Sequence, residues 1–183
     1  MTTAAHRRVG GLRDRLRRDL EPDHDRVDAA FAALVGVSGG ASGDDLPSFL
    51  SAMRAGFAAM PATPSGVRDD VLSRLDADLA RLGAAPGPAV PPVDAHPLAA
   101  DYVMLGSRSG AAYLARAWAD VPGVAGSAFF AADVDRAPWH ALSRDLAAHP
   151  ADGAFADRVV ADARAAFGVF LAAAGSDRGR AAA

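Results

Sequence analysis

The chain has 183 residues, 51% of them hydrophobic, and a formal net charge of −3, so it can bury one sizeable core and has no general attraction for nucleic acid or an anionic membrane. It has no cysteine, which excludes disulfides, thiolate metal sites and thiol nucleophiles and leaves histidine, carboxylate and hydroxyl groups as metal ligands. The first residues lack the apolar core of a signal peptide, and no run approaches the roughly 18 apolar residues of a membrane span, so we expect a soluble cytoplasmic protein.

The predicted secondary structure is helical, because apolar residues recur at steps of three or four and β-branched residues nowhere alternate with polar ones over strand length. The predicted helical segments are 11–35, with a bend at Pro22, then 47–60, 67–82, 99–120, a short piece at 127–132, 136–149 and 155–174. The proline-rich segment 83–97 is predicted to be a surface connection within one fold, since the three helices before it need a partner. We therefore expect one all-α domain over 1–183, a helical bundle with flexible tails at 1–10 and 175–183.

The first helical segment carries a histidine where its pattern asks for a leucine. An apolar stripe along this segment consists of Leu12, Leu16, Leu20, Val27, Phe31 and Leu34. His24 lies in the stripe, and one interpretation is a core histidine satisfied by a hydrogen bond. The other is an imidazole presented from an apolar wall to an iron held in a macrocycle. In that case Arg17, seven residues earlier on almost the same face, would lie near the carboxylates of the ligand.

Two glycines interrupt the predicted helix at 99–120. Gly106 and Gly110 lie four residues apart on one face, and Ala117 extends this strip of small residues. Each interior glycine costs about 1 kcal/mol of helix stability relative to alanine, so the pair needs an explanation. Either another helix packs closely against the strip, or a flat ligand lies directly on the helix backbone.

Five sequence blocks, taken in order, resemble the heme oxygenase family. LRRDLEPDHDRVDAAF around His24 is similar to the family's first helix, in which a leucine eight residues upstream precedes the proximal histidine. YVMLGSRSGAAYLA resembles the kinked distal helix, whose glycines lie over the heme. The other blocks are SAFF at 127–130, WHALSR at 139–144 and RVVADARAAF at 158–167. The resemblance covers residues 12–172 and is nearest to the bacterial members associated with phytochrome chromophore synthesis.

This resemblance implies a heme-oxygenase-like helical bundle and an enzyme that uses O2 to degrade heme, its cofactor and substrate, to biliverdin, carbon monoxide and ferrous iron. Electrons would come from an external reductase or ferredoxin, because no glycine-rich turn follows a strand to bind a nicotinamide or flavin. The biliverdin could supply a phytochrome.

The resemblance also implies roles for individual residues. His24 corresponds to the proximal iron ligand, and Gly106, Ser107 and Gly110 correspond to the catalytic, oxygen-binding side. The residues at positions where relatives contact the heme propionates are Arg17, His140 and Arg144, and Phe167 falls where an aromatic ring packs near the porphyrin edge.

Some positions depart from the family pattern. Ser107 stands where the animal enzymes carry an aspartate that organises distal water, although many bacterial relatives also have serine, and its hydroxyl could hold a water. Asp101 stands where animal relatives carry a tyrosine, and Tyr102 is adjacent.

Two other functions stay open: a heme-binding protein of the same fold that does not degrade heme, and a helical interaction module without a ligand. In the module, the arginine-rich face at 7–18 would dock an acidic partner.

Overall fold

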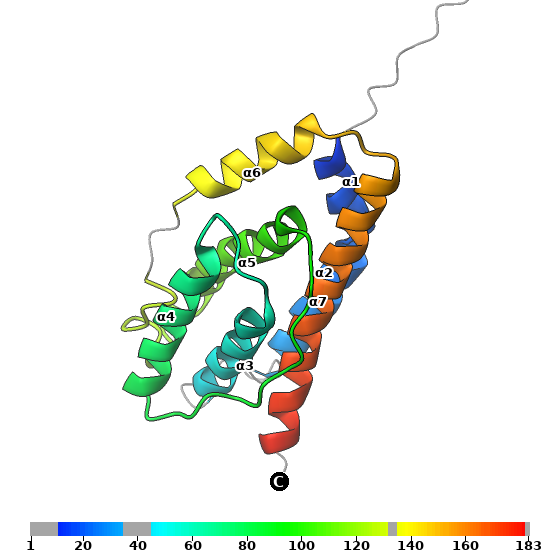
Figure 1. The fold of residues 1–183 in the computed structure, drawn as a ribbon. Helices are drawn as coiled ribbons and strands as arrows, with labels where there is room; N and C mark the ends of the chain where they lie inside the picture. The colour runs from blue at the N-terminus through cyan, green and yellow to red at the C-terminus, as the bar shows by residue number, and fades with distance from the viewer. Residues whose placement is uncertain (1–10, 35–44, 132–134, 182–183) are drawn as a thin grey trace, which may run out of the picture.

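The computed structural model describes residues 11–34, 45–131 and 135–181, which form helices and no strand (Figure 1). The helices are α1 (Leu12–Asp19), α2 (Glu21–Ala32), α3 (Leu46–Ala59), α4 (Val67–Arg81), α5 (Pro97–Ala117), α6 (Ala137–Ala148) and α7 (Ala154–Ala181). The predicted all-α fold is confirmed. The tail expected at 1–10 lies outside the described residues.

A short break divides the predicted first helix into α1 and α2. Leu20 lies between them with φ −107° and ψ 0°, and Pro22 follows in the first turn of α2. Proline has no N–H to donate to the carbonyl four residues earlier, here that of Arg18, and its ring crowds that carbonyl. The bend predicted at Pro22 is therefore confirmed and begins two residues before the proline.

The helices enclose one main hydrophobic core to which each of them contributes. The longest helix, α7, packs against α2, α3 and α5, while α4 packs on α3. α6 crosses the upper end of the molecule in Figure 1 and contacts α1 and α5. Residues 84–96 have no regular structure, yet Val90 is buried and the Val93 N–H donates to the Ala59 carbonyl at 3.0 Å. This segment therefore connects parts of one fold, as predicted.

Ion pairs fix α1 and α2 along α7. Arg15 of α1 pairs with Asp157 of α7, with Nη2 and Oδ1 2.6 Å apart. Arg164 of α7 donates from Nε to Oδ2 of the buried Asp23 at 3.0 Å. Asp23 directly precedes His24, so the second pair holds in place the turn of α2 from which His24 projects.

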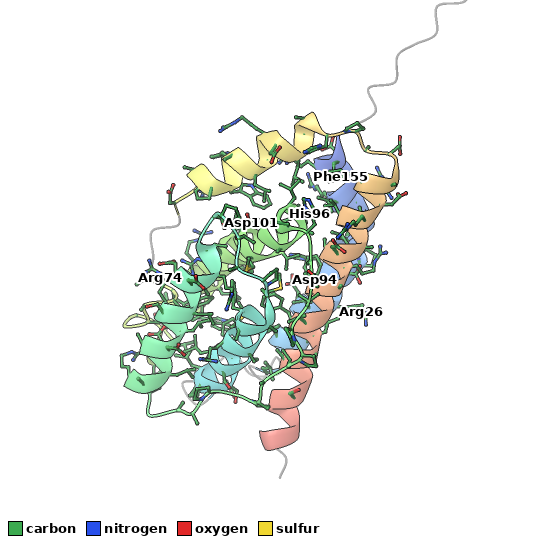
Figure 2. All side chains as sticks on the ribbon, in the orientation of Figure 1. Arg26, Arg74, Asp94, His96, Asp101 and Phe155 are labelled. Carbon is green, nitrogen blue, oxygen red and sulfur yellow. The ribbon has the colours of Figure 1, made fainter. Side chains whose placement is uncertain are left out.

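His96 fixes the start of α5 against α7. Its Nδ1 accepts the Leu98 N–H at 3.2 Å, which caps the helix, and its own N–H donates to Asp162 Oδ2 at 2.9 Å. Its ring meets that of Phe155 edge-on, with centroids 5.3 Å apart, beside the first turn of α7 (Figure 2). A helix held at its first residue keeps a defined rotation about its axis, which orients the glycine face of α5.

α3 and α7 approach each other closely at Gly56. A Cβ atom placed on this glycine would lie 2.5 Å from Cδ1 of Phe170. The Phe170 ring is also in edge-on contact with Phe57, with centroids 5.4 Å apart. The glycine therefore lets an aromatic ring of α7 lie directly on the backbone of α3.

Gly56→Ala is expected to lower the free energy of unfolding by about 1–3 kcal/mol, because an added methyl group displaces the Phe170 ring in a packed core. Gly168→Ala on α7 is the matched control. A Cβ there meets nothing within 4 Å, so that change should raise stability by about 0.5–1 kcal/mol through helix propensity. Urea unfolding measures both, and equal stability of the two variants would contradict the close packing.

The piece predicted as helical at 127–132 is wrong, since residues 127–131 form a turn. Asp78 of α4, only 1% exposed, organises it. Its carboxylate accepts hydrogen bonds from the Ser127 hydroxyl at 2.6 Å and from the Ala128 and Phe129 N–H groups at 2.8 and 2.9 Å. A buried side chain far away in the sequence thus satisfies the amides of this turn.

α7 is longer than predicted. It continues to Ala181 instead of ending at Ala174, so residues 175–181 of the expected tail are helical. Once a helix is formed, each further residue adds a hydrogen bond, and a single glycine does not stop it. By length and composition alone, Ala154–Ser176 could cross a membrane, so the expectation that no run approaches that length is wrong, and half of that apolar window is buried inside this fold.

Candidate functional site

A cavity of about 870 Å³, here named the α2–α5 cavity, has residues of both these helices in its wall. Side chains of α1, α3, α6, α7 and the 127–131 turn complete the lining. Its apolar lining includes the aromatic rings of Phe31, Phe49, Phe129, Trp139, Phe167 and Phe170. The volume falls in the range of about 300–1,000 Å³ found for pockets that bury cofactors and small ligands.

His24 faces this cavity from α2. Its side chain is 60% exposed, so the interpretation of His24 as a buried core residue is wrong. Its ring lies edge-on to Phe167, with centroids 6.2 Å apart, and its Nδ1 lies 3.3 Å from Oδ2 of Asp28, one turn later. Partial burial raises the pKa of the Asp28 carboxyl, and the charge of Asp25 adds to the rise while that of His24 opposes it. A carboxylate beside Nδ1 favours a proton on that nitrogen and leaves Nε2 as the ligating atom.

Gly106 and Gly110 line the same cavity from α5. A Cβ atom placed on either glycine meets nothing within 4 Å, so the explanation by close helix packing is wrong for the part of the chain that the structure describes. Ser107 also lines the cavity and donates its O–H to the Met104 carbonyl, with 2.8 Å between the oxygens. Its oxygen can still accept a hydrogen bond.

Two arginines and a tyrosine form a polar part of the lining. Arg17 lies here, as predicted, together with Arg13 and Tyr102. Burial raises the pKa of the Tyr102 hydroxyl, while the charges of Arg13 and Arg17 lower it. Arg13 was missed, although its position four residues before Arg17 on one helix face could have indicated it.

Tyr102, and not its neighbour Asp101, turns toward the cavity. Asp101 accepts hydrogen bonds from the hydroxyls of Thr63 and Ser65, each at 2.6 Å. It therefore ties the loop before α4 to α5.

The structure does not bring His140 or Arg144 into the lining of this cavity. α6 contributes Trp139 to the lining instead. Successive residues are about 100° apart around a helix, which places positions 140 and 144 about 100° and 140° away from Trp139. His140 lines a different cavity, and Arg144 is exposed.

Most of the aromatic lining was also missed. Phe49 comes from α3 and Phe129 from the turn that Asp78 holds, and their ring centroids are 6.4 Å apart. In the sequence both are indistinguishable from ordinary core residues, since only the packing of distant segments places them at a cavity. The predicted Phe167 does line it.

Among the described residues that line the cavity, His24 is the one histidine. Within residues 11–34, 45–131 and 135–181, no group of three histidine, aspartate or glutamate side chains could hold a bare metal ion. His24 can supply a single nitrogen ligand from an aromatic wall.

Compared with protein-family models, with curated proteins and with solved structures, the chain gives no significant match.

Proposed function

We propose that this protein binds heme in the α2–α5 cavity and degrades it to biliverdin, carbon monoxide and ferrous iron with O2. One observation carries the proposal: an accessible histidine and two glycines with open space above them line the same cavity. The glycines come from a helix far from His24 in the sequence. The helix stability that these glycines cost is explained if a flat ring occupies the space that larger side chains would fill.

The residues of the cavity fit the different parts of heme. His24 would hold the iron through Nε2, with Asp28 orienting the ring from Nδ1. The aromatic wall would pack on the porphyrin, and Arg13 and Arg17 would pair with its propionates. A protein that binds free heme needs no further metal ligands of its own, since the macrocycle supplies four nitrogens.

The chemistry would be divided between heme and protein. Heme, when bound, supplies both the iron that activates O2 and the carbon skeleton that is cleaved. His24 would be an iron ligand without the strong electron donation of a thiolate. The bare backbone at Gly106 and Gly110 leaves room for a small molecule, and the Ser107 oxygen can accept a hydrogen bond from a water there.

We propose further that the electrons come from an external reductase or ferredoxin in the cytoplasm. The biliverdin would be supplied to a phytochrome. These partners follow from the resemblance of the five blocks to bacterial heme oxygenases. The reaction consumes several electrons, and in residues 11–34, 45–131 and 135–181 no glycine-rich turn follows a strand to bind their source.

Heme binding without degradation is a second candidate. The observation that favours it is the hydrogen bond from the Ser107 hydroxyl to the Met104 carbonyl. It occupies the only proton of Ser107, so the side chain can position a water solely as an acceptor. A site with weak control over its water would retain heme and turn it over slowly.

Titration with hemin tests both candidates. We expect a sharp Soret band that saturates at one hemin per chain. Ascorbate, or a ferredoxin with its reductase, should then bleach this band in air and produce the red absorbance of biliverdin. A Soret band that persists under reducing conditions would support the second candidate, and a spectrum identical to that of free hemin would refute both.

A further inference from the structure

A second cavity, of about 600 Å³, lies on another face of α5 and is lined by α4, α5, α6 and the segments that precede α4 and α6. We name it the α4–α6 cavity. Arg108 lines it and is two residues from both Gly106 and Gly110, a rotation of about 200° around the helix. Ser109 and Trp139 line both cavities, so they separate the two.

Arg108 is a buried cation with no carboxylate partner among the residues that the structure describes. It is 6% exposed, and among the described residues no aspartate or glutamate forms an ion pair with it. Its Nη1 donates to the Phe129 carbonyl at 3.1 Å, and its guanidinium carbon lies 5.2 Å from the centre of the Phe129 ring. Burial lowers the pKa of Arg108, the charge of Arg74 lowers it further, and that of Asp70 opposes both. An arginine has five N–H groups and stays charged in proteins, so its burial is unfavourable unless a counter-charge is supplied.

The other charged groups of the cavity do not supply that counter-charge. Arg74, labelled in Figure 2, donates from Nε to both carboxylate oxygens of Asp70 at 3.0 and 2.9 Å. Asp135 accepts the N–H of Ala137 at 2.8 Å, where α6 begins.

The charges of the lining side chains do not balance. Two further arginines, Arg116 and Arg136, line the cavity. Four arginines against two aspartates leave two positive charges in excess when His140 is neutral. The cavity therefore favours a ligand with two negative charges.

We propose that the α4–α6 cavity binds a small organic dianion, a phosphate monoester or a dicarboxylate, with Arg108 as the buried ligand of its oxygens. A guanidinium presents paired N–H donors that match the oxygens of either group. The apolar part of the ligand would lie against Trp139, Leu105 and Pro138. This site goes beyond the proposed heme chemistry and shares only Ser109 and Trp139 with the lining of the α2–α5 cavity.

Thermal unfolding and calorimetry of the heme-free protein test the proposal, with phenyl phosphate and phthalate as the two probes. We expect at least one of them to bind and to raise the unfolding temperature, while sodium chloride at the same ionic strength does not. Binding of phenyl phosphate alone would identify a phosphate site, and binding of phthalate alone a dicarboxylate site. If neither probe binds, the proposal is overturned.

Variants separate a ligand role of Arg108 from a structural one. Arg108→Met should reduce the affinity for the probe by more than about tenfold, since hydrogen bonds to charged groups are strong. Its unfolding temperature without a probe should equal or exceed that of the parent, because an apolar chain of similar length replaces an unpaired buried charge. Unchanged affinity for the probe, whatever the stability of the variant, would overturn the proposal.

Arg116→Gln provides a second variant with an exposed side chain in the same cavity and should weaken binding without affecting folding. Arg158→Gln is the control, since it removes an exposed arginine of α7 outside the cavity and should leave binding unchanged. An equal loss of affinity in both variants would indicate general charge attraction and contradict a specific site. Because no heme or reductant is present, this result is independent of the proposed heme degradation.

Discussion

His24→Ala is expected to abolish the Soret band of the hemin complex or to shift it toward that of free hemin. Affinity for hemin should fall by about 100-fold or more, because even the loss of an outer partner of a metal ligand typically reduces metal affinity about 10–100-fold. The free protein should remain folded, since the His24 side chain is 60% exposed and its backbone is held by the pair of Asp23 with Arg164. Absorbance titration and circular dichroism measure the two effects separately.

A matched control for this variant exists at the end of α6. His149 also lies beside an aspartate one turn away, with Nε2 3.5 Å from Oδ1 of Asp145, but it does not line the cavity. His149→Ala should leave the hemin spectrum unchanged. Added imidazole should restore a Soret band to His24→Ala, because it can occupy the space of the missing ring. Parent-like hemin binding by His24→Ala without imidazole would exclude His24 as the iron ligand.

The apolar spacing along α1 and α2 predicted the helix face that matters here, because periodicity is a local property of the chain. Leu12, Leu16 and Leu20 are buried as predicted, and His24 stood out because an imidazole interrupts their pattern. The spacing did not predict what covers that face. At His24 it is a cavity instead of a core, which depends on where α5 and α7 pack.

The position of His140 and Arg144 outside the lining of the α2–α5 cavity has a related cause. A role transferred from similar sequence blocks assumes that the helix has the same rotation about its axis in both proteins. α6 presents Trp139 to the α2–α5 cavity, and that rotation is fixed by contacts of α6 with α1 and α5. Such contacts join segments far apart in the chain, so no local pattern in WHALSR reveals them.

Arg108 marks the limit of sequence interpretation most clearly. A charged residue between two serines on a helix is ordinarily solvated surface. It is buried here because the turn at 127–131 covers it, and that turn exists because the distant Asp78 accepts its N–H groups. The second cavity therefore results from tertiary packing and has no signature in composition or spacing.

Gly110→Leu is expected to maintain or raise the stability of the heme-free protein and to lower the rate of hemin turnover. A Cβ atom at this position meets nothing within 4 Å, and leucine is a better helix former than glycine by up to about 1 kcal/mol, so the heme-free protein should be as stable as the parent or more so. The leucine side chain would nevertheless enter the α2–α5 cavity, to which Gly110 contributes bare backbone. We expect hemin turnover to fall by at least about tenfold, which corresponds to a barrier raised by about 1.4 kcal/mol.

Gly168→Leu is the control for this change, because Gly168 is also helical and open to space within 4 Å but does not line the cavity. It should raise stability to a similar degree and leave turnover intact. Thermal unfolding together with the rate of biliverdin formation distinguishes the two variants. If Gly110→Leu instead lowers the unfolding temperature and spares turnover, the glycine serves packing and the ligand does not lie on this strip. If both variants are stable and only Gly110→Leu is inactive, the glycines of α5 are retained for the ligand at the expense of the helix.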